Sequence, residues 1–260
     1  MLLGEEREVV AAVGRRGFLA RLPPELAAEI TARAPLVHYP EGSVSFLNRD
    51  GGSVAVVVSG MLRYYLPGEE GRQLTIRYVG PGDLVGSVTR QGSGLSTAIQ
   101  AIEPSNLLHL DVKRLQAIAD REAALSTALL EEMAGRLRAA YRSLAASAFG
   151  TVRSRIARDL VERARASGQL QRGAHLQVTQ QALADAIGSV REVVARTLRE
   201  LRQEGAVASD HSGLTLLDPD ALTYQARGMA RRSRCPPGTR TQLHPARAPV
   251  GVAQHRCRRV

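Results

Sequence analysis

The sequence predicts an α+β fold in which a β-rich region, a long helix and a pair of short helices with a β-hairpin follow one another. Residues 37–112 contain short runs rich in Val, Ile, Tyr and Leu between glycine turns. Such spacing is typical of a compact antiparallel sandwich or roll. Leu130, Leu137 and Leu144 repeat every seven residues, which indicates a helix with an apolar seam. Residues 179–207 then combine two helical patterns around a glycine.

Composition excludes several classes of protein. The 260 residues suffice for two small domains and a linker. No run approaches the ~20 apolar residues of a membrane helix, and Glu5, Glu6 and Glu8 fall where a signal peptide has its apolar core. A cytoplasmic protein is therefore expected. Most of the net charge of +10 comes from residues 221–260, which hold nine arginines and no acid, whereas the rest of the chain holds 26 basic and 25 acidic groups.

The C-terminal tail also contains both cysteines, Cys235 and Cys257, without a CxxC partner. No iron–sulfur or zinc site is expected from them, and no cofactor elsewhere. Composition predicts that residues 223–260 are disordered. Two interpretations of this tail are a clamp on DNA phosphates and a dispensable extension, of which the second is preferred.

The N-terminal region, residues 1–112, begins with an amphipathic segment within residues 15–36. Pro23 and Pro24 stand at its start, where proline is tolerated. Three apolar side chains are expected to face inward, namely Leu22, Leu26 and Ile30. Five strands are then expected, at residues 54–58, 61–66, 73–79, 98–102 and 107–110.

One long helix is expected over residues 113–148, within a pattern that is helical from residue 112. Its seam comprises Leu130, Leu137 and Leu144, with Met133, Ala140 and Ser147 three positions further on. This seam can pack on the β region of the same chain or on the same helix of a second copy. The second alternative is favoured, because a solitary seam of this length gains little stability unless a partner buries it.

The C-terminal region, residues 149–222, is expected to start after a hinge at 148–150. A helix over residues 150–168 would place Val152, Ile156, Leu160 and Val161 inward. A loop with a short strand leads to the two-helix element. A β-hairpin, formed by residues 205–208 and 214–217, would follow it.

The two-helix element has the features of a helix-turn-helix. Thr179 is expected to cap the first helix, and Gly188 supplies the turn. Ser189 is expected to cap the second helix, in a capping box with Glu192. Such a pair of helices places the second one in the DNA major groove.

The second helix separates apolar and polar side chains. Its apolar side carries Val190, Val194, Leu198 and Leu201, and its polar side carries Arg191, Glu192, Ala195, Arg196 and Arg199. Arg191 and Arg196 can each offer two donors to guanine O6 and N7, and Glu192 can accept from cytosine N4. Arg199, one turn further on, is expected at phosphate or in solvent.

Three motifs stand in order along residues 18–222: GPGDLVG, SAFGTVRSRIARDLVERA and VTQQALADAIGSVREVVARTLRELRQEGAV. Together they resemble the bacterial Crp/Fnr family, related to the cyclic-AMP receptor protein and the fumarate–nitrate regulator. The resemblance implies a cyclic-nucleotide-binding-like β-roll, a long dimerisation helix and a C-terminal winged helix-turn-helix. It also implies a homodimeric transcription regulator on double-stranded DNA, with RNA polymerase as a further partner.

The resemblance places base contacts on Arg191, Glu192 and Arg196, the residues that the helix faces also select. Thr179 and Gln181 match positions that commonly contact phosphate. The full set of expected DNA-binding residues is Arg191, Glu192, Arg196, Thr179, Gln181, Ser189 and Arg199. Retention of Arg, Glu and Arg implies TGTGA-like half-sites in a palindrome, one helical turn apart.

The β-roll departs from the family pattern at each nucleotide-binding position. Ser87 stands where cyclic-nucleotide-binding members have a glutamate, Leu95-Ser96 replaces Arg-Ser or Arg-Thr, and Ala140-Tyr141 replaces two hydroxyl residues. Without the arginine fork a buried phosphate lacks its cation, so cyclic AMP is expected to bind weakly or not at all. Whether Arg77 or Arg90 takes the place of the missing phosphate-binding arginine is left open by the sequence. The residues expected around any effector are Gly86, Ser87, Ser96, Thr97 and Tyr141.

The sequence also bears on haem binding and on enzymatic activity. His38 and His109 are isolated, which favours packed or surface histidines over haem ligands. No phosphate-binding loop, nucleophile elbow or His/Glu metal spacing is found, so an enzyme is not expected. The leading hypothesis is a sequence-specific regulator, with or without a small-molecule effector. The second is a sensor whose main output is a protein contact.

Overall fold

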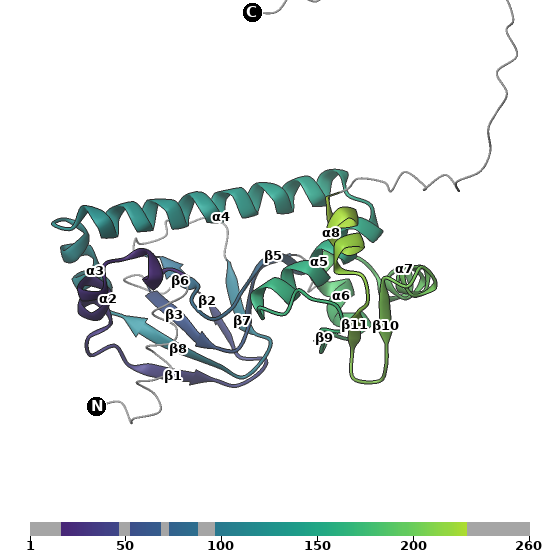
Figure 1. The fold of residues 1–260 in the computed structure, drawn as a ribbon, viewed down its shortest axis with the longest axis horizontal. Helices are drawn as coiled ribbons and strands as arrows, with labels where there is room; N and C mark the ends of the chain where they lie inside the picture. Colours follow the sequence, from purple (N-terminus) through teal and green to yellow (C-terminus); the bar gives the residue numbers. More distant parts are fainter. Residues whose placement is uncertain (1–16, 47–52, 69–72, 88–96, 228–260) are drawn as a thin grey trace, which may run out of the picture. The chain divides into compact units, whose positions relative to one another are not determined.

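The computed structural model describes residues 17–46, 53–68, 73–87 and 97–227. Two four-stranded antiparallel sheets form the N-terminal β-roll (Figure 1). The first sheet has the order β1 (Leu36–Tyr39), β8 (Ser105–Leu110), β3 (Ser53–Ser59) and β6 (Leu84–Ser87). The second has the order β2 (Val44–Phe46), β7 (Ala98–Ala101), β4 (Leu62–Pro67) and β5 (Gln73–Val79).

Strand β3 explains the long apolar run in its sequence, because it is covered on both faces. Ala55 and Val57 pack between the two sheets. Val54, Val56 and Val58 pack on the other side, in a cluster with helix residues. A strand buried on both faces carries a continuous hydrophobic run instead of an alternating one.

The cluster on the outer side of β3 is built by the helices of the N-terminal part. These are the 3₁₀ turn η1 (Leu19–Arg21), α2 (Pro24–Thr31), α3 (Val112–Ala119) and the start of α4 (Ala123–Phe149). Leu22, Leu26 and Ile30 are buried in it, as the sequence predicted. None of the helices in the described ranges is long and apolar enough to cross a membrane.

The expected strands are present, and three further strands, β1, β2 and β6, were not predicted. They have three or four residues each, which is too short for a clear periodic pattern. In β6 the strand includes Gly86, a residue that weakens strand patterns.

The single helix expected from residue 112 to 148 is wrong, because the structure contains two helices there. α3 ends at Ala119 and α4 begins at Ala123, with Glu122 as an extended N-cap. The Ser126 hydroxyl donates to the Ala119 carbonyl oxygen at 2.6 Å, which occupies one of the unpaired carbonyls at the end of α3. Asp120, Arg121 and Glu122 stand at the break and are exposed, so no buried apolar side chain lies between Ile118 of α3 and Leu125 of α4.

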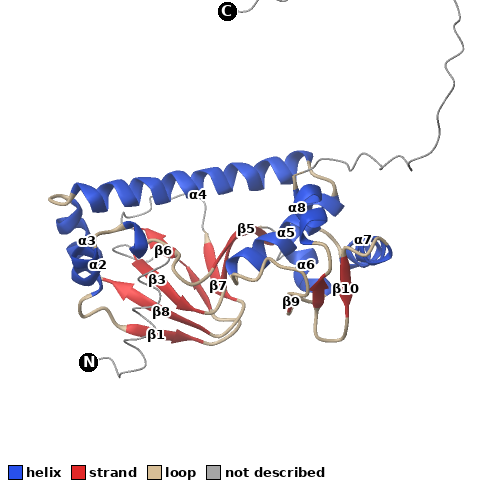
Figure 2. Cartoon of the chain, viewed as in Figure 1, coloured by secondary structure: helices blue, strands red, loops and turns tan. Residues whose placement is uncertain are grey.

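The C-terminal part contains α5 (Val152–Ala166), α6 (Gln180–Ile187), α7 (Arg191–Gln203) and α8 (Pro219–Ala226). A small sheet of order β10 (Val207–Ser209), β11 (Leu214–Leu216) and β9 (His175–Leu176) lies among them (Figure 2). Helix α8 was not predicted, and the tail expected from residue 223 is helical up to Ala226. Its remainder, with Cys235 and Cys257, lies outside the described residues.

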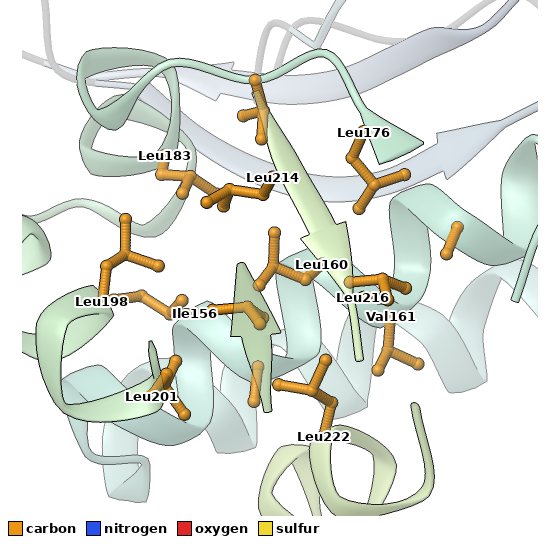
Figure 3. Packing of buried hydrophobic residues seen from close by; sticks show 14 of the residues in the cluster. Ile156, Leu160, Val161, Leu176, Leu183, Leu198, Leu201, Leu214, Leu216 and Leu222 are labelled. Carbon is orange, nitrogen blue, oxygen red and sulfur yellow. The ribbon is translucent and has the colours of Figure 1, made fainter. Parts of the chain in front are cut away.

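An aliphatic core holds the C-terminal elements together (Figure 3). Leu160 of α5, Leu183 of α6 and Leu198 of α7 are each at most 1% exposed. Leu216 of β11 and Leu222 of α8 complete the same cluster. Each element therefore contributes one apolar face to this core and leaves its other face available for contacts.

Candidate DNA-binding site and effector region

The turn between α6 and α7 is set by local chemistry. The Thr179 hydroxyl accepts from the Ala182 amide at 3.0 Å, as expected of an N-cap. Gly188 ends α6 with φ of 62°, a left-handed conformation that glycine adopts without cost. The Ser189 amide then donates to the Ala184 carbonyl oxygen at 2.9 Å, which closes the turn.

The capping box expected from Ser189 and Glu192 is wrong. Helix α7 begins at Arg191, and its N-cap is Val190, which has no side-chain capping bond. Ser189 lies one residue before the cap, so its hydroxyl is out of register with the first-turn amides. Thr179 is the residue of this element that caps with its side chain.

Helix α7 is oriented by its apolar face. Val194 is fully buried, and Leu198 and Leu201 are at most 1% exposed. Arg191, Glu192, Arg196 and Arg199 are exposed on the other side. No ion pair with a described residue engages these four side chains. Their charged groups are therefore free to contact a ligand in solvent.

A groove of about 540 Å³ lies beside α7 and is lined by Thr179 and Gln181, two of the side chains expected to contact phosphate. Its lining includes Thr179 and Gln181 at the start of α6, Arg191 on α7, and His211 at the β10–β11 turn. The first turn of α6 contributes the positive end of its helix dipole. Ser189 is half-buried, and Arg199 is exposed on α7.

The β10–β11 turn is built around Asp210. Its Oδ1 accepts from the amides of Ser212 and Gly213 at 2.7 and 3.0 Å and from the Ser212 hydroxyl at 2.6 Å. Hydrogen bonds from Ser212 hold the pKa of Asp210 below its ordinary value. The Ser212 hydroxyl also lies 3.1 Å from Nε2 of His175 on β9. This turn is thus shaped by its own side chains, and it presents His211 to solvent.

Sequence reasoning missed two residues of this surface. Arg202, in the last turn of α7, donates to the Ser209 hydroxyl on β10 and lines the groove. His211 stands at the exposed turn. The polar Asp-His-Ser-Gly sequence was the available signal for the turn, whereas the contact of Arg202 spans two elements and has no local pattern.

The effector region centres on Gly86 in β6. The Gly86 amide donates to the Tyr64 hydroxyl at 2.7 Å, and its carbonyl oxygen accepts from Nη1 of Arg136 on α4. Nη2 of Arg136 donates to the Leu84 carbonyl oxygen at 2.6 Å. Both polar groups of the Gly86 peptide are therefore occupied by side chains of the chain itself.

Glu132 holds the arginines that surround this position. Its carboxylate is one helical turn from Arg136, with Oε1 3.0 Å from Nε of that residue. Arg77 Nη1 lies 3.7 Å from the same oxygen, and Arg21 Nη2 lies 3.2 Å from Oε2. Arg77 also stacks on the ring of Tyr64, with its guanidinium carbon 4.8 Å from the ring centroid. Three cations thus share one carboxylate, and each is engaged.

The predicted effector residues are only partly brought together. Gly86 lines the cavity between the sheets, and Thr97 is half-buried before β7. Tyr141 lies on α4 with 62% of its surface exposed. The side chain of Ser87 and the whole of Ser96 and Arg90 lie outside the described residues. Arg77, one of the two proposed substitutes for the phosphate-binding arginine, is bound to Glu132 and to the Leu84 carbonyl oxygen.

The cavity between the sheets is small, at about 30 Å³. That is about the volume of one water in the liquid, far below the ~300 Å³ of small-molecule sites. Tyr39 and His109 line it, with the Tyr39 hydroxyl 3.0 Å from Nε2 of His109. The His109 ring is therefore packed against a tyrosine. His38, by contrast, is exposed and lies 3.1 Å from Oδ1 of Asn106.

Helix α4 carries an exposed apolar stripe on the side away from the roll. The side chains of Leu130, Leu137 and Leu144 are 71%, 54% and 65% exposed. Met133 and Tyr141 lie in the same stripe, with 41% and 62% exposed. Large exposed apolar patches of this kind mark interaction surfaces.

Comparisons with known proteins agree with this organisation. A model of the cyclic nucleotide-binding domain matches residues 36–122, and a model of the Crp-like helix-turn-helix domain matches residues 154–224. The chain is 31% identical to the Cyclic AMP receptor protein of Thermus thermophilus over 194 residues, covering 74% of this chain and 88% of that one. It is 27% identical to the CRP-like cAMP-activated global transcriptional regulator of Mycobacterium tuberculosis, covering 83% of this chain and 98% of that protein.

Solved structures show the same fold. A transcriptional regulator of the crp/fnr family from Eubacterium rectale superposes with a TM-score of 0.63 at 23% identity, covering 82% of this chain and 99% of that one. A CRP/FNR family regulator from Thermus thermophilus gives a TM-score of 0.60 at 27% identity, covering 74% and 98%.

Proposed function

Because the chain belongs to the Crp/Fnr family of DNA-binding transcription regulators, we propose that it acts as a homodimer on a palindromic promoter site. The observation that carries this proposal is the face of α7, where Arg191, Glu192 and Arg196 are exposed beyond a packed helix-turn-helix. No catalytic role is proposed for any residue.

The assignment of contacts follows from the chemistry of each side chain. Arg191 and Arg196 can each donate two hydrogen bonds to guanine, and Glu192 can accept from cytosine. We assign phosphate contacts to Thr179, Gln181 and Ser189 at the α6–α7 element and to Arg199 further along α7. The expected half-site is TGTGA-like, and two of them stand one helical turn apart.

The stripe on α4 supports the homodimer. Its leucines repeat every seven residues and are more than half exposed in a single chain. The same stripe on a second copy would cover it, since a/d seams pack against one another in helix pairs. Dimerisation would also place two α7 helices on one palindrome, and RNA polymerase is the expected further partner.

We propose further that the β-roll does not bind cyclic AMP in the usual way. The Gly86 peptide groups are already paired with Tyr64 and Arg136, and the cavity beside them admits about 30 Å³. A nucleotide would have to displace these side chains and open the roll. Two alternatives follow for the control of DNA binding. In one, an unidentified small molecule displaces these side chains and acts as the effector. In the other, DNA binding needs no effector.

The experiment is a random-site selection with the purified, effector-free protein at one fixed salt concentration, since phosphate contacts make affinity salt-dependent. A palindrome of TGTGA-like half-sites is the expected result, and it would identify a constitutive regulator. The matched variant Arg191→Ala should enrich a site with one base pair relaxed. If neither protein enriches any site, DNA binding requires an effector or the roll acts through a protein partner, and the proposal of constitutive binding fails.

A further inference from the structure

A buried polar cluster joins the β-roll to the helix-turn-helix domain. It consists of Tyr78 on β5 and of Asp159 and Arg163 on α5, and we call it the β5–α5 cluster. The Tyr78 hydroxyl donates to Oδ1 of Asp159 at 2.6 Å, and Nε of Arg163 donates to Oδ2 at 2.7 Å. The guanidinium carbon of Arg163 lies 4.6 Å from the centroid of the Tyr78 ring. All three residues are at most 7% exposed.

The hydrogen-bonding groups of the β5–α5 cluster are paired with one another. Both carboxylate oxygens of Asp159 are occupied, one by a residue of its own helix and one by a residue of the other domain. Burial raises the pKa of Tyr78 well above its ordinary value, so the phenol stays a neutral donor. Without the Tyr78 hydroxyl, Oδ1 of the buried Asp159 carboxylate would lose its hydrogen bond, and an unsatisfied buried acceptor is costly.

The apolar cores of the two domains are separate from each other. The core of the C-terminal part runs from residue 156 to 222, and the two cores of the N-terminal part run from residue 18 to 128. No described residue belongs to both sides. Strand β5 nevertheless contacts α5 and α6. The two domains therefore meet without sharing one apolar core, and the β5–α5 cluster supplies a directional polar contact between them.

We propose that the β5–α5 cluster holds the helix-turn-helix domain in one orientation on the β-roll, so that a dimer can place both α7 helices on one palindrome. In this orientation the base-contacting side chains of α7 are exposed. Hydrogen bonds of a buried ionic group are directional, and in some proteins such groups specify one arrangement of the packed elements. This inference rests on the proposed homodimer, whose two half-sites bind cooperatively through a fixed geometry.

The test uses Tyr78→Phe, which removes the hydroxyl and keeps the ring that Arg163 covers. Affinity is measured for a palindromic duplex and for a duplex of equal length with one half-site, at the same salt concentration. We expect about a tenfold loss of affinity for the palindrome and less than about a twofold change for the half-site, because only the palindrome depends on the relative orientation of two domains.

Tyr65→Phe is the matched control. Tyr65 is 6% exposed on neighbouring strand β4, and its hydroxyl makes no hydrogen bond with the described residues. It should behave as the wild type on both duplexes. An equal loss on both duplexes for Tyr78→Phe, no loss on either, or a gain on the palindrome would overturn the inference.

Hydrogen–deuterium exchange of the DNA-free protein separates this inference from the proposed function. Tyr78→Phe should speed exchange in β5, α5 and α6, where the domains meet, and leave β3 and β8 unchanged. If the wild type binds neither duplex, the proposed function fails. The hydrogen–deuterium exchange experiment alone then tests whether the β5–α5 cluster holds the two domains together. Unchanged exchange at β5 and α5 would then overturn it.

Discussion

The backbone amide of Gly86 donates to the hydroxyl of Tyr64 at 2.7 Å, inside the β-roll. The β6 backbone at Gly86, one of the residues expected around an effector, is thus hydrogen-bonded to a side chain of the chain itself. Arg136 completes the arrangement, because it bonds the carbonyl oxygens of Leu84 and Gly86 and is paired with Glu132.

Cyclic AMP should give no binding heat in titration calorimetry with the wild-type protein. On the proposed assignment, a nucleotide at Gly86 would have to displace Tyr64 and Arg136, and each hydrogen bond of the charged Arg136 is worth about 1.5–3 kcal/mol. The same titration with adenosine monophosphate is the control for unspecific heat. A micromolar Kd for cyclic AMP alone would contradict the prediction.

Arg191→Ala should weaken DNA binding by about 1–3 kcal/mol and relax the preference at one base pair. Arg196→Ala should act in the same way at a second position. Arg199→Ala is the comparison, because its loss should weaken all sequences alike and lower the salt dependence of binding. Affinities for a set of single-base variants of the selected site measure both effects. If all three variants have the same sequence profile, the assignment of base contacts is wrong.

Leu137→Glu should convert the proposed homodimer to monomers in sedimentation velocity, because it places a charge in the middle of the α4 stripe. Leu137 is 54% exposed in the single chain, so the fold itself should tolerate the change, with a circular dichroism spectrum like that of the wild type. Leu137→Met keeps the volume and the apolar character, and it should remain dimeric. Dimers of Leu137→Glu would show that another surface holds the two copies together.

Gly86→Ala should destabilise the protein by about 2–4 kcal/mol in urea unfolding, because it combines strain with overlap. Gly86 has φ of 88°, and a Cβ there would lie 1.7 Å from the Ser53 carbonyl oxygen. Gly188→Ala is the matched control, since its φ is 62° and nothing lies within 4 Å of the added Cβ. It should cost about 1 kcal/mol from the left-handed conformation alone. Equal costs for the two variants would contradict the packing around β6.

Acidification below about pH 6.5, the ordinary pKa of histidine, should reduce the melting temperature through His109. Burial lowers the pKa of His109 in the folded protein. The unfolded chain therefore takes up a proton first as the pH falls, and stability present at neutral pH is lost through this window. His109→Gln should flatten this part of the pH profile. A profile that is unchanged by His109→Gln would place the loss elsewhere.

The helix-turn-helix was predictable because its signals are local. The positions of Thr179 and Gly188 and the apolar spacing of Val194, Leu198 and Leu201 specify two helices and a turn within one short stretch. The capping box was wrong by one residue, since helix ends depend on turn closure as well as on residue type. The break between α3 and α4 was missed, although the charged run Asp120-Arg121-Glu122 interrupts the apolar pattern there.

The sequence by itself therefore determined most of the helices, most of the strands and the polar face of α7, because each follows from periodicity and from residues close in the chain. Only the tertiary structure decided which side chains close the β-roll and which join the two domains. Tyr64 and Gly86 are 22 residues apart, Gly86 and Arg136 are 50 apart, and Tyr78 and Asp159 are 81 apart. Contacts at such separations depend on sheet register and on how helices pack, and no local pattern in one sequence encodes them.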